Sequence, residues 1–350
     1  MPPRAEAALY RAQAALLNQQ NQAGYWVGEL QGDSILESEY LLLRFILAQE
    51  DEPALPKIAN YLRGLQNPQG GWSLFPGGPS DLSGTVKAYF ALKLMGDDPA
   101  SVHMRRARQV VLSLGGAEKC NSFTKFYFAA LGQVSYDACP SIPPEIAMLP
   151  KWFYFNLYHV SAWTRTMILP LSFVTTLGYT RQIPAKWGIR ELYIDPVAAN
   201  RVADPPRGLP RSWRDLFLRV DQLLKAYNQA PLQPLRANAM KNAERWLLDH
   251  LENSDGLGAI FPPMVYILIV MRALGYPDDH PRVVKANQHL RDLFIEEGNT
   301  IRLQPCVSPV WDTALALHAL AESGLQSDNQ AAIRATQWLL DKECRHRGLA

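Results

Sequence analysis

A short turn motif, Gln-x-x-x-Gly-x-Trp, occurs twice in this chain and constrains its fold more than any other feature. The two copies place these residue types at Gln20, Gly24 and Trp26 and at Gln66, Gly70 and Trp72. Each copy closes a stretch with apolar residues at helical spacing and precedes another such stretch. Helical hairpins repeated in this way stack side by side, so we predict an all-helical fold.

The same helix-turn-helix rhythm continues along most of the chain, with a period of about 45 residues. The hairpins can stack as an open solenoid or close into an α/α barrel. We expect the Gln amide of each turn to bond free carbonyls at a helix C-terminus while the indole covers the next turn. The predicted helices span residues 5–18, 33–47, 58–65, 83–95, 101–114, 122–131, 237–251, 264–274, 281–296, 309–322 and 328–343.

The middle of the chain interrupts this repeat of helical hairpins. Aromatic residues crowd the stretch from Trp152 to Trp163, and residues 180–211 are rich in proline and arginine and are expected to be irregular. An aromatic stripe is usually core, but its place before a long loop favours a cavity wall. The last predicted helix, 328–343, has no returning helix after it, so its apolar face is expected to lack a partner. That face carries Ile333, Trp338 and Leu339.

Composition excludes several classes of function. A net charge of +2 implies no nucleic-acid partner. Four scattered cysteines, with no Cys-x-x-Cys pair and no signal peptide, favour a reducing cytoplasm. The longest apolar stretch, from Trp163 to Tyr179, is interrupted by Arg165 and Pro170, so no membrane span is predicted.

The segment Val307–Ala314 opens a helix in which Trp311 and Asp312 stand side by side. Proline at position 309 suits the first turn of a helix, and an acidic residue there suits the helix dipole. One interpretation is a buried tryptophan beside a helix-capping aspartate. The other is a pair of side chains that face a cavity at the mouth of the helix.

Taken together, these motifs resemble those of the squalene–hopene cyclases, which are class II triterpene cyclases. The resemblance covers about residues 8–342 and includes both turns. Its other segments are Asp33–Tyr40, Phe75–Pro79 with Asp81 and Leu82, Ser161–Arg165, Pro262–Pro263 and Ser308–Thr313.

The resemblance implies two α/α barrels that enclose an apolar cavity. Residues 31–302 would form one barrel, inserted into a second barrel of which 1–30 and 303–350 are an incomplete part. The family reaction protonates a terminal alkene of squalene, after which a cation migrates through successive ring closures. Aromatic faces stabilise such a cation, and exclusion of water prevents its early quenching.

Particular residues take on roles by the same resemblance. Trp163 and Trp311 would be cavity aromatics, and Asp312 a polar wall residue. Glu39 would help to hold the hydrogen-bond network of the acid. Ile260 and Phe261 would line the cavity, although many bacterial members carry glutamine in place of Phe261. Squalene or a related linear isoprenoid is the implied ligand, with no cofactor and no metal. Peripheral contact with the inner face of the cell membrane is also implied.

One departure matters most, because the family's proton donor belongs to an Asp-x-Asp-Asp motif and the chain contains none. The pairs Asp97–Asp98 and Asp278–Asp279 are flanked by turn residues and are interpreted as solvated loops. A carboxyl group that protonates an alkene needs neighbours that strengthen it as an acid. The initiating acid is therefore predicted to be missing from these 350 residues.

Three hypotheses follow. The chain could be the cavity- and channel-forming N-terminal half of a cyclase, inactive alone and dependent on a complementing C-terminal polypeptide or a homodimer. It could instead be a non-catalytic α/α-toroid module that binds an isoprenoid lipid or a partner protein. A zinc site of Cys306, Asp312 and His318 is disfavoured, because positions 312 and 318 lie on different faces of a helix.

Overall fold

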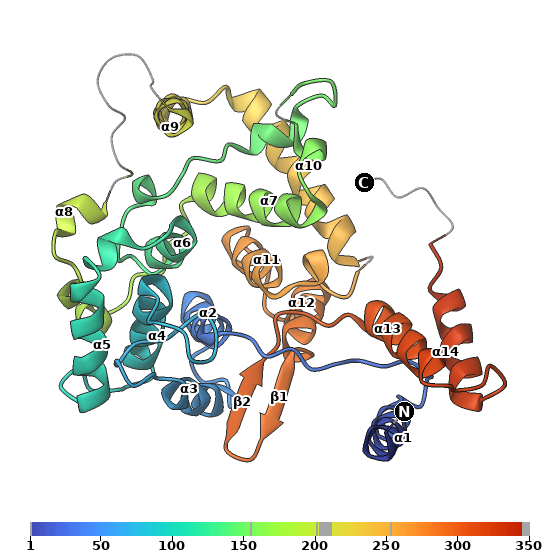
Figure 1. The fold of residues 1–350 in the computed structure, drawn as a ribbon. Helices are drawn as coiled ribbons and strands as arrows, with labels where there is room; N and C mark the ends of the chain where they lie inside the picture. The colour runs from blue at the N-terminus through green and yellow to red at the C-terminus, as the bar shows by residue number, and fades with distance from the viewer. Residues whose placement is uncertain (1, 155, 201, 203–211, 253, 345–350) are drawn as a thin grey trace. The chain divides into compact units, whose positions relative to one another are not determined.

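The computed structural model describes residues 2–154, 156–200, 202, 212–252 and 254–344. The chain folds into two compact units, one of residues 31–305 and one of residues 1–30 together with 306–350. Helices make up most of the described residues in both units, which confirms the predicted helical class (Figure 1). Among these residues, no helix combines the length and hydropathy that crossing a bilayer requires.

The larger unit has an inner layer of largely buried helices. Apolar residues surround these helices on nearly every side, so each one packs against neighbours rather than solvent. Helix α2 packs against α4, and α11 packs against both α2 and α7. The inner helices are α2 (Ser34–Leu47), α4 (Leu82–Leu94), α6 (Ser122–Ala130), α7 (Ala162–Leu177) and α11 (Phe261–Ala273).

An outer layer of amphipathic helices covers the inner one (Figure 1). Each outer helix buries a single stripe; in α5 the stripe consists of Met104, Ala107 and Val111, spaced three and four residues apart. Helices α3, α5, α10 and α12 pack on α2, α4, α7 and α11 respectively. Their bounds are α3 (Leu55–Gly64), α5 (Val102–Ser113), α10 (Gln233–Glu252) and α12 (Pro281–Arg291).

A short β-hairpin stands where the last turn of a helix was predicted. Helix α12 ends at Arg291, and strands β1 (Phe294–Glu297) and β2 (Thr300–Leu303) then pair antiparallel. Gly298 takes a φ of 58° in the two-residue turn between them, a left-handed conformation that glycine adopts readily. The predicted helix 281–296 is therefore wrong over its last residues, because a hairpin turn follows immediately.

Short elements occupy the segment that was predicted to be irregular. They are η5 (Ala185–Trp187), η6 (Arg190–Leu192) and α8 (Pro196–Ala199). Helix α9 (Trp213–Gln229) follows and was not predicted. The remaining short helices are η1 (Ala117–Lys119), η2 (Tyr136–Ala138), η3 (Pro144–Met148), η4 (Leu157–His159) and η7 (Leu257–Ala259). Predictions that fell on Phe155, on 203–211 or on 345–350 lie outside the described residues.

The smaller unit consists of α1 (Pro3–Asn18), α13 (Pro309–Glu322) and α14 (Gln330–Asp341). Its core is built on the indole of Trp26, with alanine and leucine side chains of α13 and α14 packed around it. Ile333 of α14 is exposed, whereas Trp338 is half-buried and lies 4.9 Å from the ring of Tyr25. The predicted apolar face of this helix is thus partly covered within its own unit.

Candidate functional site

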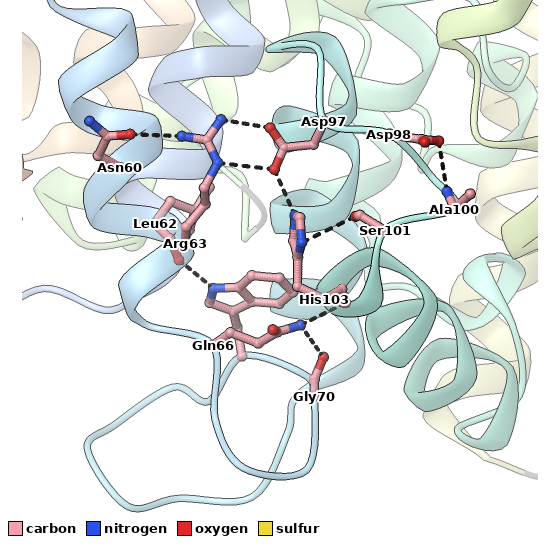
Figure 2. Close-up of polar contacts among 11 residues, drawn as sticks. Asn60, Leu62, Arg63, Gln66, Gly70, Asp97, Asp98, Ala100, Ser101 and His103 are labelled. Atoms are coloured by element: carbon pink, nitrogen blue, oxygen red, sulfur yellow. Dashed lines mark hydrogen bonds and ion pairs between the residues drawn. The ribbon is translucent and has the colours of Figure 1, made fainter.

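The two Gln-x-x-x-Gly-x-Trp turns repeat the same glutamine contacts. Gln66 Nε2 donates to the carbonyls of Gly70 at 2.8 Å and His103 at 2.9 Å (Figure 2). In the first copy, Gln20 Nε2 donates to Gly24 at 2.8 Å and to Ala331 at 2.9 Å. Gln66 therefore joins its own turn to the start of α5, and Gln20 joins its own turn to the start of α14. The expectation that each glutamine bonds carbonyls at a helix C-terminus is wrong.

The indole N–H makes that contact instead. Trp72 Nε1 donates to the carbonyl of Leu62 at 2.9 Å, and Trp26 Nε1 donates to that of Leu16 at 2.7 Å. Both carbonyls lie in the last turn of a helix, where each also accepts one backbone N–H, that of Gln19 on Leu16 and that of Leu65 on Leu62. Each tryptophan thus caps the helix before it with its ring nitrogen.

A buried threonine completes each turn and was not found by sequence reasoning. The backbone N–H of Trp72 donates to Thr85 Oγ1 at 3.0 Å, and that of Trp26 donates to Thr313 Oγ1 at 2.9 Å. Thr85 lies near the start of α4, and Thr313 lies near the start of α13. The available signal was a threonine close to the start of a helix, the fourth residue of α4 and the fifth of α13.

Asp97 is not the solvated loop residue that the sequence suggested. Its carboxylate accepts from Arg63 Nη2 at 2.6 Å and contacts His103 Nε2 at 2.7 Å, and its side chain is 7% exposed (Figure 2). Burial would raise the pKa of Asp97, but the hydrogen bonds from Arg63 and His103 outweigh it and lower the pKa. The group therefore ties α3 to α5 as a carboxylate. Asp98 and Asp278 are exposed, as expected.

Glu39 lies in a buried network between three inner helices. Its Oε1 atom is 2.5 Å from Lys87 Nζ on α4, and its Oε2 accepts from the Tyr127 hydroxyl on α6 at 2.9 Å. All three side chains are buried. Burial, followed by the negative charge of Glu39, raises the pKa of Tyr127 well above its usual value, as it does for Tyr266 of α11. The network keeps Glu39 paired with an ammonium group.

Trp163, Ile260 and Phe261 lie at neighbouring helix starts in the same unit. Trp163 is in the first turn of α7 and is 61% exposed. Ile260 and Phe261 precede and open α11, where Phe261 is fully buried and donates its N–H to the Pro305 carbonyl at 2.8 Å. Helix η7, just before Ile260, packs on α7. The structure therefore brings these three predicted residues into one region of the larger unit.

Trp311 and Asp312 belong to the smaller unit. Trp311 is 68% exposed, so the interpretation of a buried tryptophan is wrong. Asp312 Oδ2 accepts from the Gly28 N–H at 3.0 Å, and Oδ1 accepts from the Ser308 hydroxyl at 3.2 Å. The carboxylate thus ties residue 28 to the start of α13, while the indole beside it is available to a ligand or another surface.

An apolar cavity of about 930 Å³ opens beside α9 in the larger unit. Helix α9 supplies Trp213, Phe217 and Leu224 to its lining, which also includes Phe153 and Ile168. A volume near the upper end for ligand pockets suits a large apolar molecule. This cavity was not predicted because α9 was not predicted, although the apolar spacing of that helix is visible in the sequence.

Polar contacts hold the C-terminal half of α9 against η3 and α10. Glu145 Oε1 accepts from Arg236 Nε at 2.6 Å and from the Tyr227 hydroxyl at 2.9 Å. Burial would raise the pKa of Glu145, but its hydrogen bonds, led by that of Arg236, lower it. Asp221 of α9 also accepts from the Ser141 N–H at 2.6 Å. These bonds fix the position of α9, whose apolar side chains line the cavity.

Stacked helical hairpins joined by Gln–Gly–Trp turns define the class of α/α-toroid proteins. Residues 9–299 match the model of the squalene-hopene cyclase N-terminal domain, and residues 307–349 match that of the C-terminal domain. The chain belongs to the squalene–hopene cyclase family.

Individual relatives agree with this assignment. The chain is 36% identical over 343 residues to the squalene–hopene cyclase of Zymomonas mobilis, covering 95% of this chain and 51% of that protein. It is 34% identical over 336 residues to the enzyme of Alicyclobacillus acidocaldarius, with coverages of 96% and 52%. A dammaradiene synthase of Dryopteris crassirhizoma is 34% identical over 343 residues, with coverages of 98% and 50%. The chain spans about half the length of these relatives.

Proposed function

We propose that this chain is the cavity- and channel-forming N-terminal part of a squalene–hopene cyclase-like enzyme. Its ligand would be squalene or a related linear isoprenoid, cyclised to a hopanoid in the complete enzyme. The apolar cavity beside α9 carries this proposal, because a long hydrocarbon needs a wall without polar groups to compete for it. We also propose that residues 31–302 form a complete α/α barrel and that 1–30 with 303–350 are part of a second.

The aromatic and polar residues of the helix starts take roles in that enzyme. Trp163 and Trp311 would present their exposed indole faces to the migrating cation. Ile260 and Phe261 would shape the wall, and Asp312 would keep the helix start beside Trp311 in place. Glu39 would act through its bond to Tyr127 as a positioning residue, because the Lys87 ammonium group makes it an ion-pair partner rather than a proton donor.

The chain would not start the reaction alone. No Asp-x-Asp-Asp motif occurs in its 350 residues, and a homodimer would lack that motif as well. A complementing C-terminal polypeptide is therefore the partner that this proposal favours over a second copy. Protonation of an unactivated alkene requires an acid strengthened by its neighbours.

Joining the chain to the C-terminal half of a family member tests this proposal directly. The chain alone should form no hopanoid from squalene, whereas joining it to a family C-terminal half should restore product. Gas chromatography of the products, with a variant lacking the acid motif as the dead control, measures both. Hopanoid formation by the 350-residue chain alone would contradict the proposal.

Peripheral membrane contact is the second part of the proposal, since the substrate class is insoluble in water. The exposed apolar face of α9 and the exposed rings of Trp152 and Tyr154 support it. The protein would then act on the cytoplasmic face of the cell membrane. A non-catalytic module that binds an isoprenoid lipid remains the alternative function. The apolar cavity would serve it equally, and failure of the joined halves to form product would favour it.

A further inference from the structure

Arg165 carries a buried positive charge that has no acceptor among the described residues. The side chain is 7% exposed, and its Nε atom is buried without a hydrogen-bond partner. The guanidinium lies over the face of the Tyr158 ring, 5.3 Å from the guanidinium carbon to the ring centroid. A buried charge without a counter-ion costs free energy, so a guanidinium in this position indicates that an anion belongs beside it.

A second cation lies over the same ring. Lys151 Nζ is 4.6 Å from the Tyr158 centroid, and no carboxylate among the described residues pairs with it. Two like charges around one phenol ring repel each other. An anion between or beside them would remove both the repulsion and the cost of burying Arg165.

The start of α7 adds backbone donors to this pair. Arg165 lies in the first turn of the helix, which spans 16 residues. Ser161 caps the N–H of Thr164 at 3.2 Å, which leaves the N–H groups of Ala162 and Trp163 without helical partners. Helix N-termini with free N–H groups bind phosphate and other oxyanions.

The surroundings of the site indicate where such an anion comes from. Trp152 and Tyr154 follow Lys151 in the chain and carry rings that are 81% and 78% exposed, and Phe153 between them lines the apolar cavity beside α9. Tryptophan and tyrosine collect at the headgroup level of a bilayer, and basic side chains there attract anionic lipids. A binding site for a soluble phosphate compound would not require exposed aromatic rings beside it.

We infer that Arg165, Lys151 and the first turn of α7 form a binding site for the phosphate of an anionic phospholipid headgroup. The inference rests on the membrane contact proposed above and specifies the lipid class that the contact selects. In this position the headgroup would anchor the protein with the mouth of the apolar cavity facing the bilayer.

Sedimentation with vesicles tests the site in the 350-residue chain. We expect the protein to bind vesicles that contain roughly a third phosphatidylglycerol more tightly than pure phosphatidylcholine. Arg165→Met and Lys151→Met should each reduce binding to the anionic vesicles by about fivefold, the effect of one basic side chain near an anionic surface. Arg105→Met removes an exposed charge of α5 and should leave binding unchanged.

Thermal unfolding separates this role from a structural one. Because Arg165 has no acceptor to lose, Arg165→Met should not lower Tm; a marked fall would show that the guanidinium is paired within the fold and would overturn the site. Lys151 is exposed, so its variant tests the site even if Arg165→Met fails to fold. Binding to neither vesicle would refute the membrane contact itself. Equal binding to both, or a preference unchanged in the two site variants, would refute only the headgroup site. A Tm raised by inorganic phosphate without any preference among vesicles would assign the site to a soluble phosphate and overturn the inference.

Discussion

The backbone N–H of Trp26 donates to the hydroxyl of Thr313, which lies 287 positions later in the chain. In the second turn, Trp72 donates to Thr85, which lies only 13 positions later. The two bonds are otherwise equivalent. The returning helix of the first turn is therefore α13 rather than the next helix in sequence, and residues 31–305 are inserted between the two members of one hairpin.

Removing the Thr313 hydroxyl should destabilise the smaller unit. Thr313→Val keeps the shape of the side chain but leaves the buried N–H of Trp26 without an acceptor, at a cost of about 1–3 kcal/mol. Thr85→Val should have a similar cost in the larger unit. Urea unfolding, followed by tryptophan fluorescence, measures both. Thr336→Val on the exposed face of α14 is the control, and an equal effect of that substitution would contradict the role of the turn.

Breaking the buried pair of Glu39 and Lys87 should strongly lower the free energy of unfolding, whereas replacing both residues should lower it much less. Lys87→Met leaves the carboxylate without its ammonium partner inside the core, which typically costs about 3–5 kcal/mol. The double variant Glu39→Leu/Lys87→Met removes both charges and should recover a large part of that loss. A double-mutant cycle from denaturant unfolding gives the coupling free energy. Arg282→Met breaks an exposed pair with Glu252 and should cost less than about 1 kcal/mol.

Glu37 should make the stability of the larger unit depend on pH. Burial raises the pKa of Glu37 to about 8, and the hydrogen bond from the Leu303 N–H opposes this only in part. The folded state therefore holds a proton that the unfolded state releases above a pKa of 4.5. Its contribution to stability is present in full below pH 4.5 and is lost as the pH rises through about 8.

Glu37→Gln removes this titration and keeps an acceptor for the Leu303 N–H. The free energy of unfolding of the unmodified chain should fall relative to the variant between pH 5 and 8, by on the order of 1 kcal/mol per pH unit. The contributions of the other titrating groups cancel in the difference between the two free energies of unfolding. A difference that stays constant over this range would show that Glu37 is ionised in the folded protein.

The sequence predicts those parts of the fold whose pattern lies within one short stretch of the chain, and it misses contacts between residues that are far apart in the chain. Apolar spacing predicts a helix at 309–322, and α13 has those bounds, because a buried helical stripe leaves its period in the chain. Asp97 was misread because its partner Arg63 lies 34 positions away and leaves no local trace. Similarly, Glu39 was recognisable by resemblance, but Lys87 and Tyr127 come from helices 48 and 88 positions further on. Helix α9 was missed because a proline-rich segment precedes it.

An acidic residue on the apolar face of α9 should abolish membrane contact. Phe217 is exposed and lines the cavity, so Phe217→Glu places a carboxylate where a hydrocarbon surface should meet the bilayer. Binding to vesicles should fall by at least about tenfold, given roughly 1.5–3 kcal/mol for burying one such ring. Val197 of α8 is exposed and does not line the cavity, so Val197→Glu is the matched control. Equal losses in the two variants would mean that α9 has no special part in the contact.

The aromatic face of Trp163 should matter for chemistry rather than for folding. In a chain joined to an acid-bearing C-terminal half, Trp163→Ala removes a ring that is 61% exposed and has few packing contacts to lose. If that ring stabilises a cation in the dry cavity by about 2 kcal/mol, turnover should fall about 30-fold or the product should change. Trp163→Phe keeps a weaker aromatic face, so its turnover should fall less. Tyr10→Ala removes an exposed ring of α1 and should leave turnover unchanged. Product analysis by gas chromatography, with Tm as a check on folding, distinguishes these outcomes. Equal loss in the Ala and Phe variants would indicate that the size of the indole is used rather than its electron-rich face.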